Sequence, residues 1–173
     1  QLGKKVACVE ADRAGGTCLN WGCIPTKALL RNAELFHTLS HRAKEFGLKV
    51  EGLSFDWEAV IGRSRKVSDR LAGGIEFLFK KNKVDYLRGH AAIAGNSTVE
   101  VTAADGKKET HTATHILVAT GCKSRELPGL PFNGTTVVSS REALVLPAQP
   151  KSVIVIGAGA IGWSHVTDSG FWF

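Results

Sequence analysis

Cys18 and Cys23 are the residues of this sequence best suited to chemistry, because two neighbouring thiols can bind a metal or exchange electrons as a disulfide. They lie five positions apart, at the long edge of the spacing of zinc pairs, and no second pair or Cys/His partner follows them. This disfavours a metal site. Five positions along an ideal helix rise by roughly 7.5 Å, more than the roughly 4.4–6.8 Å between the Cα atoms of a disulfide. The intervening chain must therefore depart from a helix if the two sulfurs bond.

The residues around the pair allow such a departure and place a helix directly after it. Gly22 relaxes the restriction on φ, while Pro25 lacks a helix donor and suits a first helical turn. Apolar residues at helical spacing predict a helix over residues 28–39. A cysteine at the start of this helix has its thiolate stabilised by the helix dipole, and Lys27 adds a positive charge. A redox dithiol is the favoured interpretation, and a buried, inert cysteine pair is the alternative.

The stretch GGTCLNWGCIPTKALL, residues 15–30, resembles the redox-active segment of the flavoprotein disulfide reductases. Within that family, residues 19–20 and 24–27 most resemble the dihydrolipoamide dehydrogenases, and the resemblance runs from about residue 6 to residue 162. It implies that Cys18 and Cys23 form the catalytic disulfide, with Cys18 exchanging with substrate and Cys23 lying against the flavin. It also implies that Lys27 lies near the flavin ring and stabilises negative charge there.

Composition narrows the class of protein. The 173 residues are 43% hydrophobic, enough for a sizeable core, and carry a net charge of +6. The lysines are scattered and aromatics do not interleave with them, so we expect no nucleic-acid site and interpret the charge as solvated surface or a patch for an acidic partner. Four cysteines do not make a disulfide scaffold, and Cys8 is expected to be an inert core residue. No apolar run approaches about 18 residues, and the histidines show no metal constellation.

The N-terminal half resembles part of a dinucleotide-binding βαβ unit. Residues 6–10 are expected to form a short buried strand that ends in Glu10, where such units place the acid that binds the ribose hydroxyls. The strand and glycine-rich turn that should precede it are missing, so the sequence reads as an internal fragment. A second helix is expected over residues 55–82, with a bend or break at residues 73–74.

The C-terminal half changes to a strand pattern. Short strands are expected at residues 84–87, 92–93, 98–102 and 109–112, with a turn at residues 105–106, and a buried strand at residues 115–120. Residues 139–144 resemble a short capped helix. After the prolines at 147 and 150, an expected strand at residues 152–156 leads into a G-x-G-x-x-G turn made by Gly157, Gly159 and Gly162.

These elements predict an α/β fold. Residues 1–149 are expected to form an incomplete FAD-binding Rossmann-like domain with a β-meander insertion, and residues 150–162 to begin an NAD-binding domain. The resemblance implies that FAD is contacted by residues Gly16, Thr17, Ala91, Thr120 and Gly121. Cys122 stands where the family usually has serine or alanine. Residues 163–173 form an aberrant tail, in which Ser164 replaces a family glutamate that pairs with the lysine near the flavin.

The resemblance implies oxidation of dihydrolipoamide with NAD, on the lipoyl domain of a 2-oxo-acid dehydrogenase complex. It implies a homodimer for the full-length protein, whose histidine base comes from the partner subunit, and no membrane association. The location would be the bacterial cytoplasm, or the mitochondrial matrix or a plastid. The chain alone is expected to be inactive. A mercuric or glutathione reductase relative and a truncated, non-catalytic binding product are the alternatives.

Overall fold

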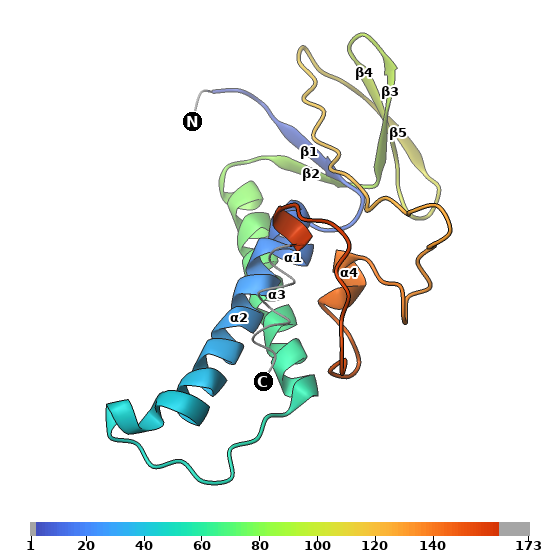
Figure 1. Ribbon diagram of the computed structural model, residues 1–173. Coiled ribbons are helices and arrows are strands. Elements are labelled where there is room, and N and C mark those ends of the chain that lie inside the picture. Colours follow the sequence, from blue (N-terminus) through green and yellow to red (C-terminus); the bar gives the residue numbers. More distant parts are fainter. Residues whose placement is uncertain (1–2, 163–173) are drawn as a thin grey trace. The chain divides into compact units, whose positions relative to one another are not determined.

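The chain, described here by a computed structural model over residues 3–162, is an α/β fold that divides into two compact units (Figure 1). One unit comprises residues 1–16 and 70–122, and the other comprises residues 17–69 and 123–173. The long helix α3 (Trp57–Lys81) begins in the second unit and ends in the first. No helix within residues 3–162 is long and apolar enough to cross a membrane.

The first unit holds two small sheets. Strands β1 (Ala7–Glu10) and β2 (Asp85–Arg88) pair in parallel, with Glu10 opposite Arg88. A parallel pair needs a long crossover connection, which the helical segments between these strands supply. An antiparallel meander follows, made of β3 (His90–Gly95), β4 (Thr98–Thr102) and β5 (Lys108–Thr112).

Between the two sheets the chain passes Gly89, whose position tolerates no side chain. A Cβ there would overlap the carbonyl oxygen of Thr102 in β4. The turn between β4 and β5 is closed by Asp105, which accepts a hydrogen bond of 3.0 Å from the amide of Lys107. This confirms the turn predicted at residues 105–106.

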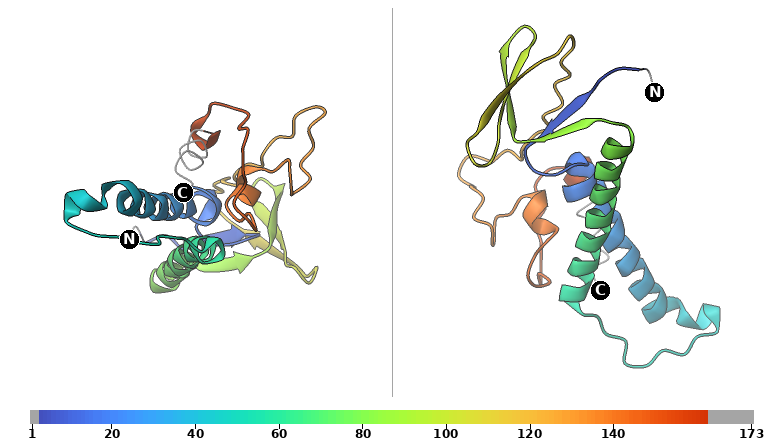
Figure 2. Two further views of the ribbon diagram at one scale, coloured as in Figure 1. Left: turned by 60° about the horizontal axis from the view of Figure 1, so that its bottom comes forward. Right: turned by 180° about the vertical axis from the view of Figure 1, so that it is seen from behind.

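The second unit is helical. α1 (Gly16–Trp21) precedes α2 (Cys23–His37), which continues into a π-helical turn, Thr38–Arg42, and a 3-10 turn, Ala43–Phe46. α2 and the first half of α3 lie side by side in the views of Figure 1 and Figure 2. The buried side chains of this unit include small ones on both helices, which permit close helix packing: Ala28, Ala33, Ser64 and Ser68.

A short helix, α4 (Ser140–Ala143), lies in the second unit and confirms the capped helix predicted at residues 139–144. Ser139 caps it in a capping box with Glu142. Leu144 directly after it is only 1% exposed. Trp57 Nε1 donates a hydrogen bond of 2.8 Å to the carbonyl oxygen of Leu146, which ties the start of α3 to this segment.

Several sequence expectations were wrong. The strands expected at residues 115–120 and 152–156 do not form, and Leu117 and Ile154 are each 90% exposed. A strand needs a hydrogen-bonded neighbour, and neither segment has a ladder partner among residues 3–162. Apolar composition alone therefore did not make them strands.

The expected break at residues 73–74 does not occur either, because α3 continues through both glycines. Glycine costs a helix about 1 kcal/mol relative to alanine, and the stripe of apolar residues on either side outweighs it. The helix predicted at 28–39 begins earlier, at Cys23, and ends as an α-helix at His37. Cys8 lies in β1 as predicted, but it is half-buried rather than part of a closed core.

Candidate functional site

Cys18 and Cys23 form a disulfide, with their Cα atoms 4.6 Å apart. The chain between them departs from a helix as the spacing requires: α1 ends at Trp21, and α2 begins at Cys23. Gly22 makes the break, with φ −152° and ψ −113°. A Cβ on Gly22 would lie 3.1 Å from the carbonyl oxygen of Thr17 and 3.3 Å from Cα of Cys18. The turn is thus packed against the backbone of the first cysteine.

The disulfide is accessible to a thiol substrate, because both cysteines are exposed. Cys23 is the first residue of α2, a helix of 15 residues. The unpaired amides and the dipole at such a terminus stabilise a negative charge, so a thiolate that forms on Cys23 is favoured. Pro25 is buried in the first turn, where its missing donor costs nothing. The pair is therefore not buried, contrary to one part of the alternative of a buried, inert pair.

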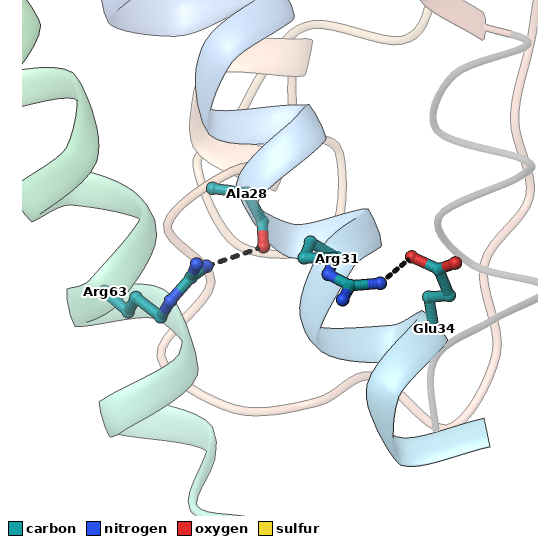
Figure 3. Close-up of polar contacts among 4 residues, drawn as sticks. All are labelled: Ala28, Arg31, Glu34 and Arg63. Carbon is teal, nitrogen blue, oxygen red and sulfur yellow. Dashed lines mark hydrogen bonds and ion pairs between the residues drawn. The ribbon is translucent and has the colours of Figure 1, made fainter. Parts of the chain in front are cut away.

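Lys27 lies one turn after Cys23 and lines an open pocket of about 360 Å³ on α2, together with Leu30, Arg31 and Glu34. Arg31 and Glu34 form an exposed ion pair of 2.6 Å. Figure 3 shows this pair on the side of α2 that faces away from Arg63. The pocket therefore offers an apolar floor at Leu30 and a positive group at Lys27.

Arginines of α3 donate hydrogen bonds both to α1 and to the opposite side of α2. Arg63 donates a hydrogen bond of 3.0 Å to the carbonyl oxygen of Ala28 (Figure 3), and Arg65 donates one of 2.7 Å to the carbonyl oxygen of Asn20. Asn20, between the two cysteines, is only 2% exposed. These contacts hold the segment that carries the disulfide against a long helix.

Two cation–π contacts to the segment that carries the disulfide were not predicted from the sequence. The guanidinium carbons of Arg65 and Arg141 lie 4.2 Å and 4.0 Å from the ring centroid of Trp21. We call these three residues the Trp21 cluster. Its members come from α3, α4 and α1, so no local spacing in the sequence could reveal it.

The other predicted site residues fall in both units. Glu10 ends β1, and its Oε1 accepts a hydrogen bond of 2.9 Å from the amide of Asp12. Gly16 and Thr17 begin α1. Ala91 lies in β3 opposite Val101 and is exposed.

Thr120, Gly121 and Cys122 are exposed and lie outside any strand. The sequence had predicted a strand ending at Thr120 and Gly121, and this prediction was wrong. Within residues 3–162 the structure shows no group of three or more His, Cys, Asp or Glu side chains that could hold a metal ion.

The backbone of the glycine turn after residue 156 requires glycine at two of its three glycine positions. Gly157 has φ +116°, a conformation that favours glycine. A Cβ on Gly162 would overlap the carbonyl oxygen of Gly157, so the close approach requires glycine there as well. Gly159 has open space around it. The tail prediction for residues 163–173, including Ser164, lies outside the described residues.

Two titrating groups of the first and second units are shifted by their surroundings. Burial, and then the charge of Glu10, raise the pKa of the Cys8 thiol above its usual value. Hydrogen bonds from Ser139 lower the pKa of Glu142 below its usual value. Cys8 is therefore held as a thiol, and its shift opposes redox reactivity.

Known proteins resemble this chain over nearly all its length. A family profile described as pyridine nucleotide-disulphide oxidoreductase matches residues 1–165. The dihydrolipoyl dehydrogenase of Chlorobaculum parvum is 50% identical over 160 residues, which is 92% of this chain and 34% of that protein. The mitochondrial dihydrolipoyl dehydrogenase of Pisum sativum is 42% identical over 163 residues, or 94% of this chain and 32% of that protein.

The fold agrees with these matches. The crystal structure of LpdA from Mycobacterium tuberculosis aligns with a TM-score of 0.74 and 23% identity, over 83% of this chain and 32% of that one. The chain thus spans about a third of the length of the relatives it matches. Its disulfide, its fold and the profile match agree, and the chain belongs to the pyridine nucleotide-disulphide oxidoreductase family.

Proposed function

We propose that the protein to which this chain belongs is an FAD-dependent disulfide oxidoreductase that oxidises dihydrolipoamide with NAD. The observation that carries this proposal is the exposed Cys18–Cys23 disulfide at the start of α2. The substrate is inferred from relatives named dihydrolipoyl dehydrogenase, which are 41–50% identical to this chain. Because the chain spans about a third of those relatives, the activity is proposed for the whole protein.

Thiol–disulfide exchange at this pair needs only the two sulfurs. A substrate thiolate attacks Cys18 Sγ, the Cys18–Cys23 bond breaks, and Cys23 leaves as a thiolate. The second substrate thiol, once deprotonated, attacks its own mixed disulfide and releases Cys18. The substrate is thereby oxidised to a cyclic disulfide, while two electrons remain on the cysteine pair. The N-terminus of α2 stabilises the Cys23 thiolate, and Lys27, one turn on, adds a positive charge.

The residues fit the cofactors that this chemistry needs. Bound FAD would supply a two-electron acceptor for the dithiol and a hydride donor for NAD. Lys27 and the pocket that it lines are proposed to meet the flavin ring. Glu10, half-buried at the end of β1, is proposed to bind the ribose hydroxyls of FAD. Further FAD contacts are proposed for Gly16, Thr17, Ala91, Thr120 and Gly121.

NAD is assigned to the turn at Gly157, Gly159 and Gly162. Its backbone is open at Gly157 and Gly159, where an added Cβ would meet nothing within 4 Å. A pyrophosphate can approach such a backbone closely. In this proposal residues 150–162 begin an NAD domain, and residues 1–149 belong to an FAD domain.

Exposed apolar segments support the finer architecture. Within the first unit, β1 pairs with β2 as its sole ladder partner among the described residues, and Leu117 and Val118 are 90% and 62% exposed. Both features are explained if a further strand, which carries the first glycine turn, lies between β1 and residues 115–120.

The partners follow from the same proposal. We infer that the dihydrolipoamide is carried on a lipoyl domain of a 2-oxo-acid dehydrogenase complex, and that the full-length protein is a homodimer. Its location would be the bacterial cytoplasm, or the matrix of mitochondria or a plastid. The net charge of +6 suits an acidic protein surface rather than nucleic acid.

The test compares substrates on the longest natural product that contains this chain, supplied with FAD. NADH formation from dihydrolipoamide supports the proposal. Reduction of glutathione disulfide or of mercuric ion with a reduced nicotinamide, without dihydrolipoamide activity, would assign the chain to one of the related reductases. The 173-residue chain by itself is expected to form no appreciable NADH, and a robust signal from it would contradict the proposed dependence on further domains.

A further inference from the structure

We propose that Arg65 and Arg141, held on Trp21, are positioning residues that stabilise the reduced form of the Cys18–Cys23 pair. The inference rests on the proposed function, because it assumes that the pair cycles between disulfide and dithiol. It goes beyond that function by assigning the control of the redox equilibrium to residues outside the pair, on two other helices.

The first step is the position of Trp21. It stands three residues after Cys18 on α1 and two residues before Cys23. Side chains three apart on a helix have Cβ atoms about 5–6 Å apart, so Trp21 and Cys18 are neighbours on the surface of α1.

The second step is the charge that the ring collects. The Arg65 and Arg141 guanidinium carbons lie 4.2 Å and 4.0 Å from the ring centroid. Both separations are within the range of about 6 Å over which a cation is attracted to an indole ring. Arg65 is fixed further by its 2.7 Å hydrogen bond to the carbonyl oxygen of Asn20. Two positive charges are thus held on the ring of a residue that lies between the two cysteines in the chain.

The third step is the consequence for exchange. When a dithiol reduces the pair, the Cys18–Cys23 bond breaks and a negative charge appears on a cysteine sulfur. Positive charge near that sulfur favours the thiolate and hence the reduced form. The oxidised pair carries no charge, so the two arginines act on the reduced state and leave the disulfide almost unaffected.

Other charges near the pair lie on α2, α3 and α4. Lys27 adds positive charge from α2. Arg63 on α3 is directed to the carbonyl oxygen of Ala28 instead of to Trp21. Glu142, next to Arg141, accepts hydrogen bonds from the amide and hydroxyl of Ser139. Its carboxylate is therefore engaged in capping α4, although it offsets part of the Arg141 charge.

The test is the equilibrium of the 173-residue chain with reduced and oxidised glutathione, followed by acid quenching, alkylation and mass spectrometry of Cys18 and Cys23. A unit charge roughly 10 Å away in a partly aqueous setting changes such an equilibrium by about threefold. We expect Arg65→Gln to favour the disulfide about threefold. Arg141→Gln should do so about twofold, because Arg141 is exposed and screened. The double variant should favour it more than either single variant.

Arg63→Gln is the matched control, because it removes the same charge from the same helix but no contact to Trp21. The lysine variants Arg65→Lys and Arg141→Lys should recover most of the shift, and high salt should reduce it. A purely structural role would give neither result. Since Arg141 is exposed, its variants report on charge even if Arg65→Gln disturbs packing.

The inference is overturned if the double variant stays within about 1.5-fold of the unchanged chain, if Arg63→Gln shifts the equilibrium equally, or if lysine gives no recovery. Failure of the proposed function looks different. In that case the pair would not exchange reversibly with glutathione even in the unchanged chain, and both ideas would fall together.

Discussion

Replacement of Gly22 by alanine should make the Cys18–Cys23 disulfide easier to reduce. The new Cβ would lie 3.1 Å from the carbonyl oxygen of Thr17 and 3.3 Å from Cα of Cys18. Both neighbours are backbone atoms of the segment that the disulfide closes, so they must move by a few tenths of an ångström. After reduction the two cysteines are no longer joined, and the turn can open to accept the methyl group. The penalty therefore falls mainly on the oxidised form.

An added methyl group in a tightly packed place costs about 1–3 kcal/mol. A cost of about 2 kcal/mol corresponds to roughly 30-fold in the exchange equilibrium, or a potential about 45 mV more positive. Equilibration with dithiothreitol redox buffers, followed by alkylation and mass spectrometry, measures this shift. Gly62→Ala is the control, because its Cβ would meet nothing within 4 Å and it lies in α3. A Gly22→Ala chain within twofold of the control would refute the coupling of this glycine to the disulfide.

Three further outcomes are expected. Leu144→Ala should lower the free energy of unfolding by about 2–5 kcal/mol in urea titrations, because Leu144 is 1% exposed; an unchanged midpoint would contradict its packing. Ser139→Ala should cost about 1 kcal/mol by loss of the cap. Because Ser139 lowers the pKa of Glu142, the Ser139–Glu142 interaction stabilises the fold above the ordinary carboxyl pKa, and this contribution is lost as pH falls through the lowered pKa. The Ser139→Ala variant lacks the interaction, so its free energy of unfolding should fall less on acidification. Cys8, with its raised pKa, should react with iodoacetamide more slowly than exposed Cys122, and Glu10→Gln should speed it.

The sequence was most informative where local pattern decides structure. The turn at residues 105–106 and the cap at Ser139 each depend on residues within a few positions of one another. The redox pair could be inferred for the same reason, since the spacing of Cys18 and Cys23 and the glycine between them are local features.

Features that depend on neighbours distant in the chain were predicted wrongly or not at all. Residues 115–120 have strand composition but form no strand, because pairing requires another strand beside them. The Trp21 cluster joins α1, α3 and α4, and no spacing in the sequence connects Arg65 or Arg141 to Trp21. A bend or break was expected at glycines 73 and 74, yet α3 continues through both, supported by its apolar stripe.

The most direct test of the central claim uses cysteine variants of the longest natural product that contains this chain, assayed with FAD for NAD reduction by dihydrolipoamide. Cys18→Ser and Cys23→Ser should each lower the rate by at least about a thousandfold, because neither variant can form the disulfide. Cys8→Ser and Cys122→Ser should leave it within about twofold, since both are free thiols outside the pair. Activity within tenfold of normal after loss of Cys18 or Cys23 would contradict the account.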